Sequence, residues 1–317
     1  MKKTVLVTGG AGYIGSALVY DLANKGHQVV ALDNLSTGQR GKVDKRAEFC
    51  EGDIHDTAIL SNLCKRYRID TVIHCAGKKA VGESEHNPVL YFQTNVAGTI
   101  SLLSAMVEND IPHIIFSSTA SVYKPPVNNQ PVSEYSDIEP LNVYGHTKLI
   151  AEHIIKEFVR TKKIKCFTIF RYFNVAGDSG LRYIEENAQN VFPAILQALH
   201  GKKKFSIYGT NYDTADGTGV RDYIHLKDLV SAHMLALQEK ESHIYNLGTG
   251  VGYSVKELLK TFEDVTSCTV PSIEAPPRLG DPAVVTADSG KARKVLGWEP
   301  QFTMSDIVKS ICIHSDF

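Results

Sequence analysis

The stretch Thr4-Val-Leu-Val-Thr8, which runs into Gly9-Gly-Ala-Gly12-Tyr-Ile-Gly15, decides the fold of the first part of this chain. The short apolar run predicts a buried strand. The glycines after it predict a tight turn, a close approach of the backbone to a ligand, and close packing of a helix at residues 15–24 against the strand. The chain is therefore expected to open with a strand, a turn and a helix.

The rest of the first half repeats this alternation. We expect further strands at residues 28–32, 71–76, 113–117 and 166–170, and helices at residues 58–66, 88–108 and 143–162. Buried strands that alternate with helices predict an α/β fold, with a parallel sheet covered on both faces. After about residue 172 loops, glycines and prolines become frequent. We therefore expect a first domain at residues 1–172 and a second at 173–317, with some segments of the second returning to the first.

The turn and the helix after it form a candidate phosphate site, since the first N–H groups of a helix and its dipole favour anions. Asp33 ends the next expected strand, where its carboxylate can accept hydrogen bonds from ribose hydroxyls and repel a 2′-phosphate. Together these features predict a Rossmann-type, doubly wound parallel sheet that binds NAD rather than NADP. Asp53 follows an expected third strand and is either an adenine contact or an ordinary loop acid.

Composition excludes several classes of function. The chain has 317 residues, 43% of them hydrophobic, and a net charge of -1 with no long run of one sign, so a nucleic-acid or membrane face is not indicated. No segment approaches the length of about 18 apolar residues that a membrane span needs. Six scattered cysteines favour free thiols in a reducing cytoplasm. Twelve histidines without a His-Glu-x-x-His motif give no support for a metal site.

The stretch Tyr144-Gly-His-Thr-Lys148 places a phenol and an ammonium four residues apart, on one face of a helix. A base that oxidises an alcohol needs a pKa near 7, and tyrosine has a pKa of about 10, a difference of about 4 kcal/mol. One cation at about 5 Å supplies roughly 3 kcal/mol at an effective dielectric of about 20. We therefore expect Lys148 and the positive nicotinamide ring to lower the pKa of Tyr144 together.

The same spacing recurs at Tyr223-Ile-His-Leu-Lys227, so the pattern is weak by itself. Thr119 favours the first copy, because it follows an expected strand and the carboxyl ends of parallel strands form the ligand crevice. Its hydroxyl can bond to the reacting hydroxyl and pass on its proton, or it can simply cap a helix or turn. Tyr223 instead lies close to Arg221, a side chain suited to phosphate. We assign Tyr144 as the base and a structural role to Tyr223.

Nine stretches, spread over nearly the whole chain, match one known family. They are Val7-Thr-Gly-Gly-Ala-Gly-Tyr-Ile-Gly-Ser16, Leu32-Asp-Asn-Leu35, Lys79-Ala-Val-Gly-Glu-Ser84, Phe116-Ser-Ser118, Tyr144-Gly-x-x-Lys148, Arg171-Tyr-Phe-Asn174, Asp216-Gly-Thr-x-Val-Arg-Asp-Tyr-Ile-His225, Tyr245-Asn-Leu-Gly248 and Arg278-x-Gly-Asp281. By these stretches the chain resembles the extended short-chain dehydrogenase/reductase family, and within it the UDP-glucose (UDP-galactose) 4-epimerases. The glycine turn is shared by many dehydrogenases, whereas residues 79–84 and 216–225 are specific.

The resemblance implies a smaller, loop-rich C-terminal substrate domain and a tightly held NAD. It implies that the base takes the proton of the sugar 4-hydroxyl while a hydride leaves C4. The resulting 4-keto sugar then turns over in the pocket, and the hydride returns to its other face. The product is the C4 epimer, with no net oxidation. The substrates implied are UDP-hexoses, such as UDP-glucose and UDP-galactose.

The resemblance also assigns site residues. Catalysis would depend on Tyr144, Lys148 and Thr119. The cofactor would be bound by Gly9, Gly12, Tyr13, Ile14, Gly15, Asp33, Asn34, Asp53, Ile54, Ala76, Gly77, Lys79, Asn95, Tyr144, Lys148 and Tyr172. The UDP-sugar would be bound by Thr119, Tyr144, Asn174, Asn190, Val191, Tyr208, Arg221, Arg278, Asp281 and Val285. Two arginines suit two phosphates, because a guanidinium fork matches phosphate oxygens.

Three positions depart from the family's usual residues. Lys124, after Tyr123, stands where a glycine is usual, and nothing in the sequence explains it. Thr119 stands where relatives often carry serine, and its hydroxyl can serve the same role. Val285, in Ala283-Val-Val-Thr286, aligns with a position that often carries tyrosine or cysteine at the sugar pocket. Our hypothesis is that this small side chain leaves room for an N-acetyl group, so that UDP-GlcNAc and UDP-GalNAc are also interconverted. A core role for Val285 is equally compatible with the sequence.

Other functions remain open on the sequence alone. A 4-epimerase of UDP-uronic acids or pentoses, another nucleotide-sugar oxidoreductase and a dehydratase use the same scaffold. A dehydratase needs a carboxylate after the strand-end hydroxyl, which Ser118-Thr-Ala-Ser121 lacks. A redox-sensing binding protein is a further alternative, disfavoured by the intact Tyr144 and Lys148. The helices at 88–108 and 143–162 carry apolar residues on more than one face, so we expect a homodimer.

Overall fold

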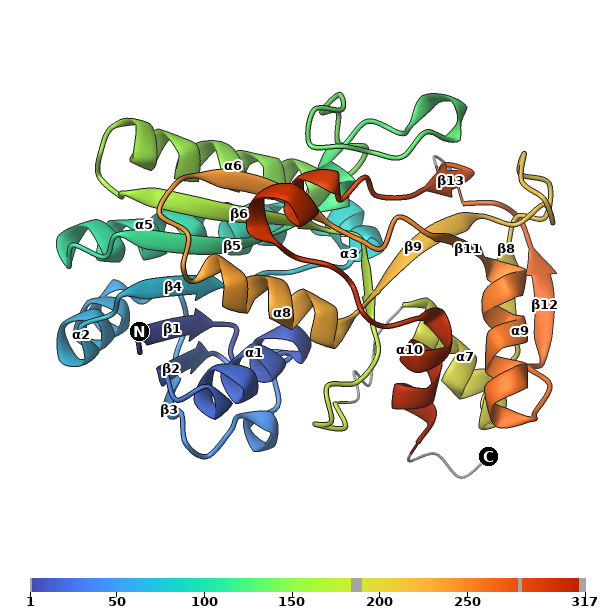
Figure 1. The fold of residues 1–317 in the computed structure, drawn as a ribbon, viewed down its shortest axis with the longest axis horizontal. Coiled ribbons are helices and arrows are strands. Elements are labelled where there is room, and N and C mark those ends of the chain that lie inside the picture. The colour runs from blue at the N-terminus through green and yellow to red at the C-terminus, as the bar shows by residue number, and fades with distance from the viewer. Residues whose placement is uncertain (1, 184–189, 279–280, 314–317) are drawn as a thin grey trace. The chain divides into compact units, whose positions relative to one another are not determined.

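The structure is a computed structural model that describes residues 2–183, 190–278 and 281–313 (Figure 1). Its chain divides into two compact units, each made of three segments. Unit 1 consists of Met1–Val122, Ile138–Tyr172 and Val230–Tyr245, and unit 2 of Tyr123–Asp137, Phe173–Leu229 and Asn246–Phe317. The expected boundary near residue 172 coincides with one of the places where the chain passes between units.

Unit 1 is built on a seven-stranded sheet in the order β10-β6-β5-β4-β1-β2-β3. The pairs from β6 to β3 are all parallel. The strands are β1 (Thr4–Thr8), β2 (Gln28–Asp33), β3 (Glu48–Glu51), β4 (Thr71–His74), β5 (His113–Thr119), β6 (Cys166–Tyr172) and β10 (His243–Leu247). Strand order reverses between β1 and β4, and ligands of open α/β sheets bind at this switch point. The predicted Rossmann-type sheet is confirmed.

Helices cover both faces of this sheet (Figure 1). They are α1 (Tyr13–Asn24), α2 (Thr57–Tyr67), α3 (Val81–His86), α4 (Pro88–Phe92), α5 (Gly98–Glu108), α6 (Val143–Arg160) and α8 (Leu226–Ala236), with short 3-10 turns at Arg40–Lys42 and Ala120–Val122. Successive side chains of β6 point to opposite faces of the sheet. Ile169 belongs to the core formed with α2, α5 and α6, whereas Phe170 packs against His233 of α8, with ring centroids 4.7 Å apart.

The expected helix at residues 88–108 is interrupted in the structure. It divides into α4, a π-helical turn at Gln93–Ala97, and α5. π-turns inside helices are often found at functional sites. This one carries Asn95, which is 2% exposed and was predicted as a cofactor residue.

Unit 2 is smaller and richer in loops. Its strands are β7 (Asn174–Ala176), β8 (Phe205–Tyr208), β9 (Val220–His225), β11 (Gly252–Ser254), β12 (Ser272–Ala275) and β13 (Val284–Val285); its helices are α7 (Val191–Leu199), α9 (Val255–Thr266) and α10 (Met304–Cys312), with a 3-10 turn at Val127–Asn129 and a π-turn at Ala292–Leu296. β9 is the central strand, paired with β7, β11 and β13. Phe192, Tyr223 and Phe262 lie in its hydrophobic core.

A buried carboxylate holds the loops of unit 2 against β9. Asp222 accepts hydrogen bonds from the amides of Thr249, Gly250 and Ala287 at 2.8, 2.8 and 3.0 Å. Burial raises the pKa of Asp222, and these donors oppose the rise. One side chain therefore fixes two loops beside the neighbouring residue Arg221.

Candidate active site

The turn between β1 and α1 leaves no room for a side chain at Gly9 or Gly15. Gly9 has a φ of +70°, and a Cβ there would lie 2.7 Å from the amide nitrogen of Ala76. A Cβ on Gly15 would lie 2.0 Å from the carbonyl oxygen of Gly9. Gly12 is the N-cap residue of α1 and has no side chain with which to cap it. The first N–H groups of α1 can therefore serve a pyrophosphate.

Asp33 lies at the end of β2 and is only 8% exposed. Its Oδ2 accepts a hydrogen bond from the amide of Ala11 at 2.9 Å, and its Oδ1 accepts one from the amide of Leu35 at 2.8 Å. These bonds fix the carboxylate beside the glycine turn. Each oxygen keeps a second lone pair, so the geometry leaves acceptors for the ribose hydroxyls that the sequence predicts.

The predicted adenine-side residues form a second cluster. Asn34 donates from Nδ2 to Oδ2 of Asp53 at 2.7 Å, and Oδ1 of Asp53 accepts the amide of His55 at 2.9 Å. Ile54 is 6% exposed, and a Cβ on Gly98 would lie 2.4 Å from its Cδ1. α5 therefore approaches this loop closely only because residue 98 is glycine. The structure thus brings Asn34, Asp53 and Ile54 together beyond the ends of β2 and β3.

The loop after β4 is tied to the π-turn. Asn95 accepts a hydrogen bond from the amide of Lys78 at 2.8 Å and donates to the Lys78 carbonyl and to the Thr147 hydroxyl, both at 3.0 Å. A Cβ on Gly77 would lie 2.9 Å from Oδ1 of Asn95. Asn95 therefore joins the loop that contains Ala76, Gly77 and Lys79 to helix α6, which carries Thr147.

The first residues of α1 meet this loop. Tyr13 and Ile14 open the helix, and Nζ of Lys79 lies 5.8 Å from the centroid of the Tyr13 ring. This distance is within the range of a cation–π contact. The predicted residues from the glycine turn and from the loop after β4 are therefore neighbours across the switch point of the sheet.

Tyr144 is set in place by the beginning of α6. Oδ1 of Asn142 caps the helix by accepting the amide of Gly145 at 2.8 Å. The amide of Tyr144 itself donates to Oγ of Ser84 at 3.2 Å, so α3 holds the same turn. The Thr119 hydroxyl, at the end of β5, lies close enough to the phenol to lower the pKa of Tyr144. The structure thus joins the two predicted catalytic hydroxyls, Thr119 and Tyr144.

The pKa of Tyr144 is high in the chain alone. Burial raises the pKa of Tyr144 to about 12, and Thr119 lowers it only in part. The ammonium of Lys148 donates to the carbonyl oxygen of Ser117 at 2.9 Å and lies 4.8 Å from the centroid of the Phe116 ring. The prediction that Lys148 and the nicotinamide ring together lower this pKa stays a prediction, because the value of about 12 belongs to the chain alone. Further positive charge is needed to stabilise the phenolate.

Lys148 is itself buried, with 5% exposure. Burial lowers the pKa of Lys148 to about 8, while negative charge on Cys75 and Glu152 would oppose that shift. The pKa of Lys148 is thus close to neutral pH, so this ammonium loses its proton more easily than that of an exposed lysine. The ammonium bonds to the carbonyl of Ser117, which comes two residues before Thr119 in β5. The Lys148 ammonium therefore lies beside the end of that strand.

A chain of buried hydrogen bonds runs behind these residues and was not predicted. The Ser117 hydroxyl lies 2.9 Å from the hydroxyl of Tyr172, which lies 2.8 Å from Nε2 of His233. Tyr172 was predicted as a cofactor residue, whereas Ser117 and His233 were not singled out for this role. His233 is 0% exposed and lies on α8, far along the sequence from β6. Only the tertiary structure brings it to Tyr172.

A buried ion pair holds α6 on the sheet. Glu152 binds Arg171 of β6 through two hydrogen bonds of 3.0 and 2.6 Å, and it accepts the Ser118 hydroxyl at 2.6 Å. Glu152 is 0% and Arg171 3% exposed. Glu152 lies four residues after Lys148 and eight after Tyr144, on the same face of α6. That spacing was the available sequence signal for an acid on the buried face.

The predicted UDP-sugar residues all lie in unit 2, apart from Thr119 and Tyr144. Arg221 forms an ion pair with Asp281 at 3.6 Å, and Val285 of β13 is paired in register with Arg221 of β9. The guanidinium of Arg278 lies 4.2 Å from the centroid of the Tyr208 ring. Four of the predicted residues therefore form two contacting pairs: Arg221 with Asp281, and Arg278 with Tyr208.

The remaining predicted substrate residues lie at the ends of elements in unit 2. Asn174 donates to the carbonyl oxygen of Asp222 at 2.9 Å and so joins β7 to β9. Asn190 is the N-cap residue of α7, and Val191 is the first residue of that helix. The part of Asn190 and Val191 in a common site with Arg221 and Arg278 stays a prediction.

The second Tyr-x-x-x-Lys copy has a different setting. Tyr223 lies on β9 and Lys227 on α8, so the two do not share a helix face. Tyr223 is 4% exposed and packs edge-on against Phe192, with ring centroids 5.3 Å apart. It therefore has the structural role assigned to it.

Residues 5–248, which include the glycine turn, Tyr144 and Arg221, match the NAD dependent epimerase/dehydratase family. The chain belongs to this family. One relative within the NAD dependent epimerase/dehydratase family is a UDP-glucose 4-epimerase of Lactobacillus helveticus, which is 44% identical over 312 residues, covering 96% of this chain and 94% of the relative. The family expected from the sequence is thereby confirmed.

Solved structures of epimerases share the fold. A UDP-glucose 4-epimerase of Bifidobacterium longum, in complex with NAD+ and UDP, is 36% identical and superposes with a TM-score of 0.91, covering 98% of each chain. The UDP-Glc/GlcNAc 4-epimerase of Campylobacter jejuni is 34% identical, with a TM-score of 0.86 and 98% of each chain covered. The likeness extends over both units of this epimerase/dehydratase family member, so each unit has its counterpart in these enzymes.

Proposed function

We propose that the protein is an isomerase that inverts C4 of UDP-hexoses, interconverting UDP-glucose and UDP-galactose with NAD as cofactor. The observation that carries this proposal is the joining of Tyr144, Thr119 and Lys148 at the end of β5, in a chain of the NAD dependent epimerase/dehydratase family. Names of relatives agree, since those at 44% and 42% identity are UDP-glucose 4-epimerases.

The chain's residues provide the acid–base chemistry. When bound, NAD supplies a hydride acceptor that later becomes the donor. Tyr144 takes the proton of the sugar 4-hydroxyl, and Thr119 stabilises the phenolate by donating to it. Because the chain raises the pKa of Tyr144 to about 12, the phenolate forms only beside added positive charge, which fits an oxidised nicotinamide ring. The same tyrosine returns the proton once the 4-keto sugar has turned, so no net oxidation occurs.

The two units have different tasks in this proposal. Unit 1 carries the glycine turn, Asp33, Asn95 and Tyr144, and we assign NAD binding to it. Unit 2 carries the two arginines, and we assign UDP binding to it. Arg221 and Arg278 supply positive charge for two phosphates, and Tyr208 supports Arg278 from one side. Anchoring through UDP leaves the sugar free to turn, which epimerisation requires.

We further propose that UDP-GlcNAc is accepted. Val285 has a small side chain, and it lies in register with Arg221, the proposed phosphate residue. One of the similar structures is named a UDP-Glc/GlcNAc 4-epimerase. If Val285 borders the sugar pocket, Val285→Tyr should abolish turnover of UDP-GlcNAc and retain turnover of UDP-glucose. Equal losses on both substrates would instead indicate a core role for Val285.

We also propose that the protein is a cytoplasmic homodimer. Val89, Phe92 and Ile100 are 67%, 40% and 42% exposed, so α4 and α5 carry an apolar surface that a second copy can cover. The free cysteines suit a reducing compartment. Sedimentation equilibrium should give twice the monomer mass, and Ile100→Glu should shift it toward the monomer. A monomer mass for the unmodified protein would overturn the dimer.

One experiment tests the main proposal. The purified protein is incubated separately with UDP-glucose, UDP-GlcNAc and UDP-glucuronate, and the sugars are separated by chromatography. We expect UDP-galactose from UDP-glucose, without net release of NADH. Product only from UDP-glucuronate would replace the hexose proposal with a uronic-acid epimerase, and accumulation of NADH would replace it with a dehydrogenase.

A further inference from the structure

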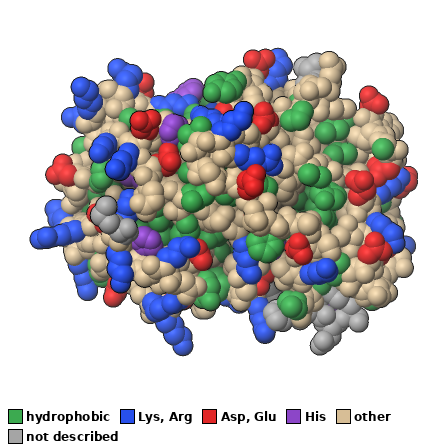
Figure 2. Space-filling view, viewed as in Figure 1, with side chains coloured by type: hydrophobic (Ala, Val, Ile, Leu, Met, Phe, Trp, Pro, Cys, Tyr) green, Lys and Arg blue, Asp and Glu red, His purple; other side chains and the backbone are tan. Residues whose placement is uncertain are grey.

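A cavity lies in unit 1, away from the residues assigned to NAD. It has a volume of about 160 Å³ and is bordered by the beginnings of β1, β4, β5 and β6 and by the segment after α8. Thr119 and Tyr172 lie at the opposite ends of β5 and β6. In Figure 2, Lys and Arg side chains gather on the side of the molecule where these strands begin. The cavity is thus at the amino-terminal edge of the sheet, whereas the cofactor residues are at the carboxyl edge.

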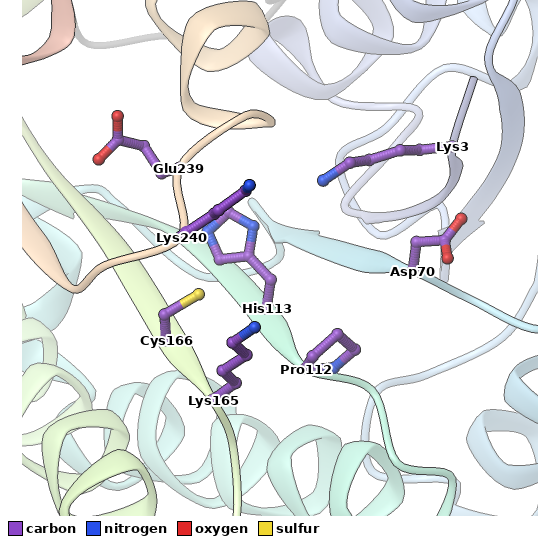
Figure 3. A pocket seen from close by; sticks show the side chains of 8 residues that line it. All are labelled: Lys3, Asp70, Pro112, His113, Lys165, Cys166, Glu239 and Lys240. Carbon is purple, nitrogen blue, oxygen red and sulfur yellow. The ribbon is translucent and has the colours of Figure 1, made fainter. Parts of the chain in front are cut away.

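Three ammonium groups converge in this cavity. Figure 3 shows the side chains of Lys3, Lys165 and Lys240 directed toward one another around the ring of His113. Lys165 and Lys240 are exposed, and Lys3 is partly buried and donates to the carbonyl oxygen of Leu237. Three separate segments of the chain therefore each contribute one lysine to the cavity.

The two acids that border the cavity point away from its centre (Figure 3). Oδ2 of Asp70 accepts the amide of Thr4 at 2.8 Å. The carboxylate of Glu239 lies 3.4 Å from Nε2 of His243, and it accepts the hydroxyl of Tyr245 at 3.3 Å. Both carboxylates thus have partners outside the cavity, although the charge of Asp70 also acts on Lys3. Three lysines against two acids leave a net positive charge around the cavity.

His113 provides an independent sign of a ligand. The residue is 3% exposed, and its Nε2 lies 3.3 Å from the hydroxyl of Thr168. Among the described residues its Nδ1 has no hydrogen-bond partner. Burial and the charge of Lys3 lower the pKa of His113 to about 4, so the ring is neutral near pH 7. If the Thr168 hydroxyl donates to Nε2, Nδ1 carries the hydrogen and needs an acceptor. Buried polar groups are rarely left unpaired.

We propose that this cavity binds a phosphate-class oxyanion, either inorganic phosphate or the phosphate of a small ester. Lys3, Lys165 and Lys240 donate to its oxygens, and the ring of His113 borders the site. Donors from several directions suit a tetrahedral anion with several oxygens better than a single flat carboxylate, and lysine is a common phosphate binder. This site is separate from the proposed nucleotide-sugar site and does not depend on epimerase activity.

The test is calorimetric titration of the protein with inorganic phosphate, repeated on R221Q/R278Q, which lacks the proposed phosphate residues of the nucleotide-sugar site. We expect saturable binding that chloride at equal ionic strength does not reproduce. The double variant K165Q/K240Q should bind at least ten-fold more weakly. The control K25Q/K65Q removes two exposed lysines outside the cavity and should bind like the unmodified protein. Equal weakening in both double variants would show a general charge effect and overturn the proposal.

A second readout reports on His113 directly. In ¹⁵N spectra of the histidine rings, one imidazole should shift on adding phosphate, and that signal should be missing in H113Q. Titration with glycerol phosphate then separates the two sources of the anion. Binding of both ligands extends the site to phosphate esters, and binding of inorganic phosphate alone restricts it to the free ion. No shift with either ligand would overturn the proposal, whatever the epimerase assay shows.

Discussion

At the scale of single residues, the phenol of Tyr144 needs help to ionise. The chain buries this hydroxyl and raises its pKa to about 12, while Thr119 lowers it only in part. Lys148, four residues further along α6, donates a hydrogen bond to the backbone carbonyl of Ser117. The Tyr-x-x-x-Lys pattern alone therefore does not determine how easily Tyr144 ionises. Burial, Thr119 and the Ser117 carbonyl also affect Tyr144 and Lys148.

Tyr144→Phe removes the proposed base and retains the ring. We expect kcat to fall by about 10²–10⁴, the usual contribution of a general base, with NAD content and melting temperature close to those of the unmodified protein. Tyr223→Phe is the matched control, because it removes the hydroxyl of the second copy in the core of unit 2. Comparable loss of activity in both variants would contradict the assignment of Tyr144.

Residue spacing predicted which side chains would lie together better than it predicted their chemistry. Tyr144 and Lys148 do share one helix, and Thr119 does end the strand beside them. The direction of the Lys148 ammonium depends on the Ser117 carbonyl, and the pKa of Tyr144 depends on burial. Neither dependence has a local sequence signal, and the expected lowering of the Tyr144 pKa by Lys148 together with the nicotinamide ring stays a prediction.

At the scale of elements, strands and most helix ends were predictable, because apolar runs and caps are local features. β1 has the predicted bounds, and α6 begins at the predicted Val143. The interruption of the helix at residues 88–108 was not predictable. Its π-turn is held by bonds between Asn95 and the backbone of Lys78, a contact between separate segments.

The turn between β1 and α1 gives an element-scale prediction. In Gly15→Ala the new Cβ would lie 2.0 Å from the Gly9 carbonyl oxygen, so α1 must shift away from the turn. We expect lost NAD, a lower melting temperature and little activity. Gly41→Ala is the control, since no atom lies within 4 Å of its Cβ position. NAD content measured after purification checks both variants, and full NAD content in Gly15→Ala would contradict the close approach.

The buried ion pair between Glu152 and Arg171 gives a second prediction at the scale of elements. Glu152→Gln leaves the buried guanidinium of Arg171 without its carboxylate, and we expect the free energy of unfolding to fall by about 3–5 kcal/mol. Glu152→Leu combined with Arg171→Met removes both charges and should recover most of that loss. Urea denaturation measures both. If the double variant is no more stable than the single one, the cost does not come from the unpaired charge.

At the scale of the whole molecule, buried neutral histidines link stability to pH. His74 is 1% exposed and lies between the hydroxyls of Thr8 and Thr99, at 2.7 and 3.0 Å. Burial, with a smaller effect of the Lys148 charge, lowers the pKa of His74 to about 3. In the unfolded chain the value is about 6.5. Between these two values the unfolded chain binds one more proton, so stability falls as the pH falls.

His74→Gln should make that dependence flatter. Over about pH 4 to 6 the free energy of unfolding of the unmodified protein should change more steeply, by about 1.4 kcal/mol per pH unit, because one buried histidine contributes one proton. Urea denaturation at several pH values gives both slopes. His55→Gln is a control, since that histidine is exposed and bound to Asp53. Parallel slopes for His74→Gln and the unmodified protein would rule out His74 as the linked group.

The assignment of segments to units was only partly predictable. Loop-rich texture after residue 172 indicated a second domain, but residues 123–137 group with it although they come before α6. Their place depends on contacts with distant residues, such as the bridge between Val132 and Ala287 and the bond from Tyr123 to Asn246. Long-range pairing of this kind has no periodic signal in the sequence.

The three-segment composition of each unit has a consequence for synthesis on the ribosome. Unit 1 ends with Val230–Tyr245, so its last segment leaves the exit tunnel only after most of the chain has been translated. Unit 2 also includes Asn246–Phe317, so it is completed later than unit 1. Nascent chains that stop before residue 230 lack α8 and β10, and with them His233, the partner of Tyr172. A truncated product thus exposes the edge of β6 and offers proteases an incomplete sheet.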